Sequence, residues 1–294
     1  MTLLLTGSTG FLGQTLLKNL PSYTITTLGR KNATIIANLA AQIPLLPQTD
    51  LVIHAAGKAH IVPKTEAEKQ DFFDVNVTGT QNLLAGLENN PPKAFVFISS
   101  VAVYGLNEGQ LINENKPLNA KDPYGLSKIK AEEIITQWCQ KHHVICTILR
   151  LPLLVAENPP GNLGAMIKGI KKGYYFNIAG GLAQKSMVMA SCVAKAIEKV
   201  APIGGIYNLT DGYHPNFKQL SAHIATQLGK KIPANIPNWL AMFLAKVGDA
   251  LGKKAPFNTY KLSKIKAPLT FDDSKARKAF GWQPQQVLQV FRVY

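Results

Sequence analysis

The first thirteen residues decide the fold, and they read Met1-Thr2-Leu3-Leu4-Leu5-Thr6-Gly7-Ser8-Thr9-Gly10-Phe11-Leu12-Gly13. The β-rich run Thr2 to Thr6 leads directly into three glycines, each three residues from the next. Glycines at such a turn let the backbone approach a pyrophosphate closely, and the amides at the start of the following helix face it. The stretch therefore predicts a strand, a phosphate-binding turn and a helix. The residues expected to contact a dinucleotide are Gly7, Thr9, Gly10, Phe11, Leu12 and Gly13.

Outward from this stretch, short β-rich runs alternate with amphipathic helical segments, which is typical of a parallel sheet covered by helices. Further strands are predicted at Tyr23 to Leu28, Leu51 to His54, Ala94 to Ile98 and Val144 to Leu149. Helices with apolar residues three and four apart are predicted at Gly13 to Asn19, Asp71 to Glu88 and Tyr124 to Lys141. The predicted fold is a doubly wound parallel α/β sheet of the Rossmann type with a smaller C-terminal lobe.

The strand and helix rhythm loosens after Pro152, where a Pro- and Gly-rich passage covers Glu157 to Gly164. We predict a dinucleotide-binding domain over residues 1–156, with 186–209 returning to it. Residues 157–185 and 210–294 are then a substrate-binding lobe. In that lobe, Trp239 to Leu251 reads as a helix that is either amphipathic or buried, and a subunit or membrane-surface contact stays open.

The chain of 294 residues carries a formal net charge of +15, with 32 Lys plus Arg against 17 Asp plus Glu. Only four of the cations are arginines, so the excess is lysine, which is typical of a solvated surface. The densest lysine cluster has no nucleic-acid recognition pattern, and it comprises Lys253, Lys254, Lys261, Lys264 and Lys266. We therefore predict no specific nucleic-acid partner.

Other sequence features limit the class of protein. No apolar run approaches the roughly 18 residues that span a bilayer, and no basic leader precedes the first strand. The three cysteines form no CxxC pair, and the six histidines show no metal-ligand spacing. Tyr104 and Cys192 have no partner visible in the sequence and are expected to be packing residues. We predict a cytoplasmic protein with no membrane span and no metal, and a homodimer is compatible with the sequence.

The end of the second strand bears on cofactor choice. An acidic residue there binds the ribose hydroxyls of NAD, whereas an Arg accommodates the 2′-phosphate of NADP. This chain reads Leu28-Gly29-Arg30-Lys31, without a carboxylate. Arg30 therefore favours NADP, with NAD as the alternative.

A tyrosine and a lysine four residues apart, Tyr124 and Lys128, share one face of a predicted helix. An ammonium close to a phenol favours its ionised form, so we expect Lys128 to lower the pKa of Tyr124. A tuned phenol can exchange a proton with an alcohol or carbonyl, and the hydroxyl of Ser100 can steady the oxygen. The three residues predict a catalytic group.

Together these motifs resemble the NAD(P)-dependent epimerase/dehydratase family of extended short-chain dehydrogenases. His54-Ala55-Ala56-Gly57 resembles the family motif after the fourth strand, and Asn76-Val77-Thr78-Gly79-Thr80 resembles its NVxGT segment. The resemblance implies that His54, Ala55, Ala56 and Asn76 contact the cofactor along with Tyr124 and Lys128. Further similarity, at Ala56-Gly57-Lys58-Ala59-His60 and from Phe257 to Pro284, is to bacterial nucleotide-sugar 4-ketoreductases and 4-epimerases.

The resemblance also implies a substrate and a reaction. Ser100, Asn162 and Lys185 match positions that contact a nucleotide-activated sugar, although the segment Arg150 to Glu157 departs from the family's RPxxVYGP. The expected chemistry is NADP(H)-dependent reduction or epimerisation at a keto or hydroxyl carbon, with Tyr124 as general acid and base. Two alternatives stay open: a reductase of a non-sugar ketone, and a catalytically silent NADP-sensing or RNA-associated protein.

Overall fold

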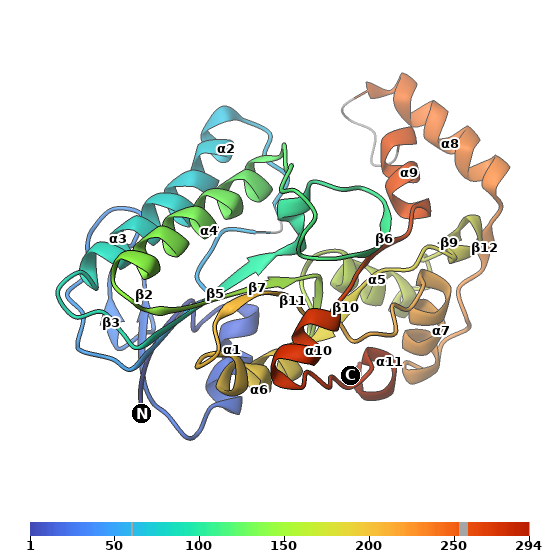
Figure 1. The fold of residues 1–294 in the computed structure, drawn as a ribbon. Helices are drawn as coiled ribbons and strands as arrows, with labels where there is room; N and C mark the ends of the chain where they lie inside the picture. The colour runs from blue at the N-terminus through green and yellow to red at the C-terminus, as the bar shows by residue number, and fades with distance from the viewer. Residues whose placement is uncertain (60, 253–257, 294) are drawn as a thin grey trace.

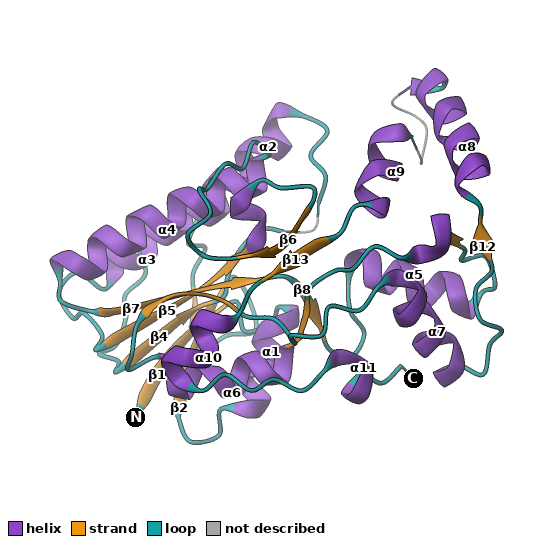
Figure 2. Cartoon of the chain, turned by 45° about the vertical axis from the view of Figure 1, so that its right-hand side comes forward, coloured by secondary structure: helices purple, strands orange, loops and turns teal. Residues whose placement is uncertain are grey.

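The computed structural model describes residues 1–59, 61–252 and 258–293. Its centre is a parallel sheet whose strands lie in the order β11-β7-β5-β4-β1-β2-β3 (Figures 1 and 2). The strands are β1 Thr2–Thr6, β2 Thr24–Gly29, β3 Ile35–Ile36, β4 Leu51–His54, β5 Ala94–Ser100, β7 Ile145–Leu151 and β11 Gly205–Asn208. The predicted doubly wound α/β fold is confirmed.

Helices cover both faces of the sheet because its strands carry apolar side chains on both sides. In β1, Leu3 and Leu5 pack toward the helices α1 (Phe11–Asn19) and α6 (Ala190–Val200). Leu4 points to the opposite face, where it joins the cluster formed by α3 (Gly79–Gly86) and α4 (Pro123–Lys141). Figure 1 shows the two helical layers above and below the sheet.

The long helix predicted at Asp71 to Glu88 is interrupted. It begins earlier as α2 (Glu66–Phe73), passes through a π-helical turn at Asp74–Thr78, and continues as α3. Thr65 and Glu68 form a capping box that sets the start of α2. The π turn contains Asn76, and such turns are frequent at functional sites.

The second lobe has its own core of apolar residues. Leu163, Ile170, Leu220 and Ile224 of α5 (Gly161–Lys171) and α7 (Phe217–Gln227) pack together there. Short parallel strand pairs complete it: β8 (Leu153–Val155) with β10 (Met187–Met189), β9 (Asn177–Ile178) with β12 (Asn235–Ile236), and β6 (Gly109–Ile112) with β13 (Leu269–Phe271). The remaining helices are α8 Asn238–Ala250, α9 Thr259–Lys266, α10 Ser274–Phe280 and α11 Val287–Val290.

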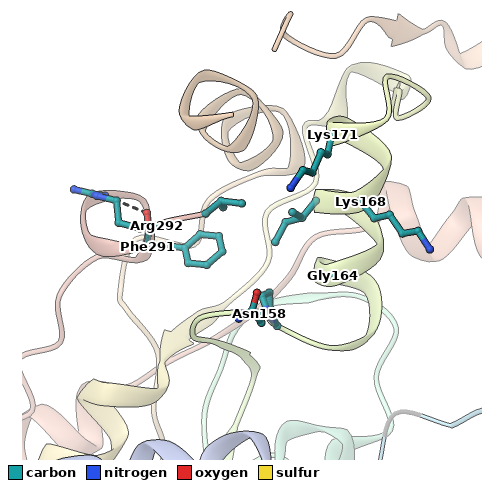
Figure 3. Close-up of a pocket in the computed structure, with 9 residues that line it drawn as sticks. Asn158, Gly164, Lys168, Lys171, Phe291 and Arg292 are labelled. Atoms are coloured by element: carbon teal, nitrogen blue, oxygen red, sulfur yellow. Dashed lines mark hydrogen bonds between the residues drawn. The ribbon is translucent and has the colours of Figure 1, made fainter. Parts of the chain in front are cut away.

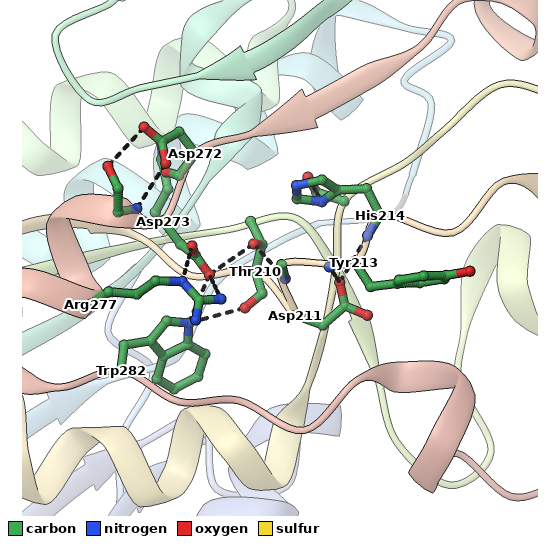
Figure 4. Close-up of polar contacts among 12 residues, drawn as sticks. Thr210, Asp211, Tyr213, His214, Asp272, Asp273, Arg277 and Trp282 are labelled. Atoms are coloured by element: carbon green, nitrogen blue, oxygen red, sulfur yellow. Dashed lines mark hydrogen bonds and ion pairs between the residues drawn. The ribbon is translucent and has the colours of Figure 1, made fainter.

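The end of the chain returns to the main sheet and is fastened there by polar contacts (Figure 4). The indole N–H of Trp282 donates to the carbonyl of Thr210 at 3.0 Å and to Asp273 at 3.1 Å. The carboxylate of Asp273 also accepts from Arg277, one turn further along α10. Ala276 and Trp282 are buried in the same cluster as β1 and α6. The residues of this segment that carry the family resemblance are thus packed against the main sheet.

No helix in the part of the chain that the structure describes is both long and apolar enough to cross a membrane.

Candidate active site

A cleft opens at the carboxyl ends of β1, β4, β5 and β7, between the sheet and the second lobe. This edge is where parallel α/β sheets bind their ligands. Ten of the predicted site residues line it: Gly7, Gly10, Phe11, Leu12, Gly13, Ala55, Ser100, Tyr124, Lys128 and Asn162. Among the described residues, six predicted ones do not: Thr9, Arg30, His54, Ala56, Asn76 and Lys185. His60 lies outside the described residues.

The glycine turn is tight enough to require glycines. Gly7 has a φ of +73°, and a Cβ there would lie 2.6 Å from the backbone nitrogen of Ala56. A Cβ at Gly13 would lie 2.0 Å from the carbonyl oxygen of Gly7. Gly10 caps α1 without any side-chain hydrogen bond, so the first amides of the helix keep their donors for a ligand. This cradle fits a pyrophosphate.

The first two turns of α4 place Tyr124 and Lys128 in the lining of the cleft. Asp122 accepts a hydrogen bond from the Gly125 amide at 3.0 Å, and Pro123 occupies the first helical position, so the helix begins at this point. Lys128 is buried, and its Nζ donates to the carbonyl of Ile98 at 2.8 Å while lying 4.4 Å from the centre of the Phe97 ring. The lysine is therefore fixed against the end of β5.

The pKa values of Tyr124 and Lys128 are shifted differently from what the sequence predicted. The pKa of Tyr124 is raised, because burial disfavours the phenolate more strongly than a hydrogen bond with Ser100 favours it. Burial also lowers the pKa of Lys128 to about 8, although the carboxylate of Glu132 acts in the opposite direction. The expected lowering of the Tyr124 pKa by Lys128 is thus wrong for this arrangement. Burial instead shifts the phenol of Tyr124 toward its neutral form.

Ser100 is the last residue of β5, at the same sheet edge. Its hydroxyl accepts a hydrogen bond from the amide of Ala102 at 3.2 Å and so caps a short 3₁₀ turn, Val101–Tyr104. That turn directs the chain away from the cleft and leaves the hydroxyl of Ser100 beside Tyr124.

His54 and Asn76 support the cleft from behind. The ring of His54 is fully buried between the hydroxyls of Thr6, at 2.7 Å, and Thr80, at 3.0 Å, and burial lowers its pKa to about 3. Asn76 bonds both the amide and the carbonyl of Lys58, at 2.7 and 3.1 Å, and the hydroxyl of Ser127 at 2.9 Å. Both side chains hold backbone segments that border the cleft.

Arg30 and Lys185 lie at its margins. Arg30 is exposed just beyond the end of β2, and β2 pairs with β1 up to the glycine turn. The Nζ of Lys185 donates to the carbonyls of Lys264 and Ala267, at 3.2 and 2.9 Å. Lys185 therefore satisfies the C-terminal carbonyls of α9 instead of facing the cleft.

A buried ionic network behind the cleft was not predicted. Arg150 of β7 forms a forked pair with Glu132 of α4, with Nη2 to Oε2 at 2.7 Å. Glu132 also accepts from the hydroxyl of Ser99 at 2.5 Å. Tyr104, which was expected only to pack, accepts from Arg150 and donates to Asn208 at 2.8 Å. The sequence signal that could have revealed this network is Glu132, which lies one helical turn after Lys128 on the same face of α4.

A second hollow lies on the far side of α5, between that helix and the end of the chain (Figure 3). Lys168, Lys171 and Arg292 surround it, with Phe291 on its wall. None of the predicted site residues lines it. Within the described ranges, no group of three or more His, Cys, Asp or Glu side chains could hold a metal ion.

The sequence of residues 3–209 matches the family model of the NAD dependent epimerase/dehydratase family. The chain belongs to this family. The matched residues end just after β11, so they include every strand of the parallel sheet except Thr2 of β1, together with the predicted catalytic residues Ser100, Tyr124 and Lys128.

This chain is 31% identical to a curated relative, N-acetyl-alpha-D-glucosaminyl-diphospho-ditrans,octacis-undecaprenol 4-epimerase of Escherichia coli O157:H7. The similarity covers 94% of this chain and 88% of the relative. UDP-glucose 4-epimerase of Vibrio cholerae is 26% identical, over 98% of this chain and 92% of the relative. The fold of this chain is similar to that of UDP-N-acetylglucosamine 4-epimerase from Bacillus cereus. The TM-score is 0.76 at 20% identity, over 97% of this chain and 94% of the other.

Proposed function

We propose that this family member is a nicotinamide-dependent 4-epimerase of a sugar carried on a diphosphate, with a nucleotide as the carrier and Tyr124 as the general acid and base. The observation that carries the proposal is the cleft in which the glycine turn, Ser100, Tyr124 and Lys128 share one lining. Two relatives matched over nearly the whole chain bear the name of 4-epimerases, which favours epimerisation over net reduction.

The glycine turn and the first turn of α1 would hold the cofactor's pyrophosphate, since the space beside Gly7 and Gly13 admits no side chain. A bound nicotinamide supplies a reversible hydride acceptor. Arg30 favours a 2′-phosphate at the end of β2, which makes NADP the preferred form and NAD the alternative. Lys128 would hold the ribose.

The protein's own chemistry is proton transfer and orientation. The ionised form of Tyr124 would take the proton of a sugar hydroxyl as the carbonyl forms and the bound nicotinamide accepts the hydride, and the resulting neutral phenol would return the proton when the hydroxyl is restored on the other face. Burial raises the pKa of Tyr124, and the positive charge of an oxidised nicotinamide would favour the ionised form that this step requires. Ser100 donates to the same oxygen and holds it beside the phenol. Asn162 of α5 also lines the cleft and would contact the diphosphate carrier. Lys185 could join it only by leaving the carbonyls of α9.

The test is conversion of UDP-sugars differing at C4, followed by chromatography, together with nicotinamide absorbance. We expect interconversion without net change in the cofactor. Stoichiometric NADPH oxidation with a keto sugar would instead make the chain a ketoreductase. Turnover of apolar ketones only, or cofactor binding without any turnover, would support the non-sugar reductase or the silent sensor.

Cofactor choice has its own test. Replacing Arg30 by Ala should weaken NADPH binding about tenfold and leave NADH binding unchanged, because only NADPH carries the additional phosphate. Titration calorimetry measures both affinities. Lys18→Ala, on the exposed side of α1, is the matched control for loss of one cation. An equal loss for both cofactors would contradict the assignment of Arg30.

A second carrier is favoured by one observation. The relative with 31% identity is named for a sugar linked through a diphosphate to undecaprenol, a lipid. The same cleft chemistry would serve such a substrate, because the diphosphate is shared and the reacting C4 lies on the sugar.

A further inference from the structure

Helix α8 presents its larger apolar side chains outward. Its inner face consists of Ala241, Ala245 and Gly248, which are buried against the rest of the second lobe. The opposite side carries Trp239 and Phe243, which are 71% and 60% exposed. Met242, Leu244, Val247 and Leu251 extend this exposed apolar surface. A helix with small residues inside and aromatic residues outside lacks the partner that its outer face requires.

In both Figure 1 and Figure 2, α8 is the outermost element of its side of the molecule, with α9 beneath it. The two helices pack through Leu262 of α9 and the small residues of α8. No described element of the chain covers the outer face.

The charge around this face identifies what would cover it. Helices α8 and α9 and the described residues next to them, 237–252 and 258–266, contain four lysines and one acidic residue, Asp249. All four lysines are exposed: Lys246, Lys261, Lys264 and Lys266. Two copies of such a surface would repel each other, whereas an anionic lipid surface would attract each of them. Exposed aromatic and aliphatic residues beside lysines are typical of helices that lie in a membrane interface.

The position of α9 connects this surface to the cleft. Ser263, Lys264 and Ala267 border the loop Gly105–Glu108, which follows the turn after Ser100. The amide of Gly109 donates to the carbonyl of Pro268 at 2.9 Å. Helix α9, against which α8 packs, therefore lies at the same end of the sheet as Ser100.

We propose that α8 docks this protein on an anionic membrane surface, with Trp239, Phe243, Leu244, Val247 and Leu251 in the headgroup layer and the lysines of α9 near lipid phosphates. Docking would bring a lipid-carried sugar diphosphate to the cleft. That choice of carrier rests on the proposed function, whereas the docking itself does not.

Trp239 provides a direct readout, because the other two tryptophans of the chain, Trp138 and Trp282, are only 9% and 5% exposed. Tryptophan emission is recorded with vesicles of equal parts phosphatidylglycerol and phosphatidylcholine, and with phosphatidylcholine alone. We expect a blue shift and co-sedimentation with the anionic vesicles, weakened by salt. Phe243→Glu should lower the partition coefficient roughly tenfold or more, since it inserts a charge into the apolar face.

Leu45→Glu is the matched control, because Leu45 is 95% exposed in a loop before β4, far from α8 in the sequence, and should leave vesicle binding unchanged. No wild-type binding, or equal losses in both variants, would overturn the proposal. So would a wild-type dimer in sedimentation velocity that Phe243→Glu dissociates while vesicles bind neither protein, because a second copy would then cover α8.

Turnover of a soluble UDP-sugar, measured on the same samples, separates the two proposals. Phe243 lines no part of the cleft, so Phe243→Glu should retain wild-type turnover of that substrate. Vesicle binding without any turnover by the wild type would contradict the proposed function and leave the docking surface standing. Turnover without vesicle binding would contradict the docking surface and leave the proposed function standing.

Discussion

The first half of α4 with the neighbouring strand β7, and the outer face of α8, both depart from the usual pattern of polar residues outside and apolar residues inside. Behind the cleft, charged and polar groups such as Lys128, Glu132 and Arg150 are buried, and each has a partner. On α8, large apolar groups are exposed and lack one. A buried charge needs a partner within the fold, whereas an exposed apolar face can be satisfied by a surface outside it. We therefore propose that the first region serves catalysis and that the second sets the location of the protein.

The largest expected effect is on turnover, and it comes from Tyr124 on α4. Tyr124→Phe should lower kcat by about 10²- to 10⁴-fold, because it removes the proton donor and acceptor while keeping the ring. Steady-state kinetics with a soluble UDP-sugar measures the loss. Tyr104→Phe is the matched control, since its phenol is bonded to Asn208 and Arg150 and lines no part of the cleft. Equal losses in both variants would contradict the catalytic assignment of Tyr124.

The second effect is on stability. Glu132→Gln should lower the free energy of unfolding by about 3–5 kcal/mol, because it leaves the guanidinium of Arg150 buried without a counter-charge. Urea unfolding followed by circular dichroism gives the value. Glu133→Gln, next in sequence and exposed in its pair with Lys130, should change it by only a few tenths of a kcal/mol. Similar losses of unfolding free energy in the two variants would mean that burial of the ion pair does not determine how much its loss destabilises the fold.

The buried imidazole of His54 predicts a loss of stability in acid. Its pKa is about 3 in the folded chain and near 6.5 when exposed, so between these values only the unfolded chain takes up a proton. The free energy of unfolding should therefore fall by about 1.4 kcal/mol for each pH unit below roughly 6.5.

Urea unfolding at several pH values above about 4.5, where most carboxylates stay ionised, limits the slope to the histidines. His54→Gln should remove most of it, because glutamine does not titrate, and the remainder is expected from His214, whose pKa burial also lowers. If wild type and variant lose stability in parallel, the imidazole is not the group responsible.

The smallest effect is expected on α8. Leu244→Ala should change the free energy of unfolding by no more than about 0.5 kcal/mol, because its side chain already contacts solvent. Leu5→Ala, the same change in the fully buried β1, should cost about 2–5 kcal/mol. Thermal unfolding of the two variants measures the contrast. A large cost at Leu244 would show that the outer face of α8 stabilises the fold and is not available for docking.

Local sequence was sufficient for the parallel sheet and for most of the cleft. The glycine spacing, the Asp122-Pro123 helix start and the strand ending at Ser100 are short-range signals, and each specifies a local backbone path. Asn76 appeared only as part of a family motif, and the π turn around it depends on the distant loop at Lys58.

The remaining features depend on pairs that are far apart in the sequence. Lys185 meets Ala267 across 82 residues, so its role as a helix cap could not be foreseen. The pKa of Tyr124 depends on how completely the second lobe and α2 bury it. For α8, periodicity predicts which residues share a face, but exposure follows only from what packs on that face.

The fastening of Trp282 to Thr210 and Asp273 has a kinetic consequence. Ala276 and Trp282 are also buried in the cluster around β1 and α6, so separating this segment from the main sheet would break packing as well as hydrogen bonds. We expect substrate exchange through loop and side-chain movement while the dinucleotide stays in place for many cycles. Slow cofactor release suits an isomerase, whose cofactor ends each cycle in the oxidation state in which it began.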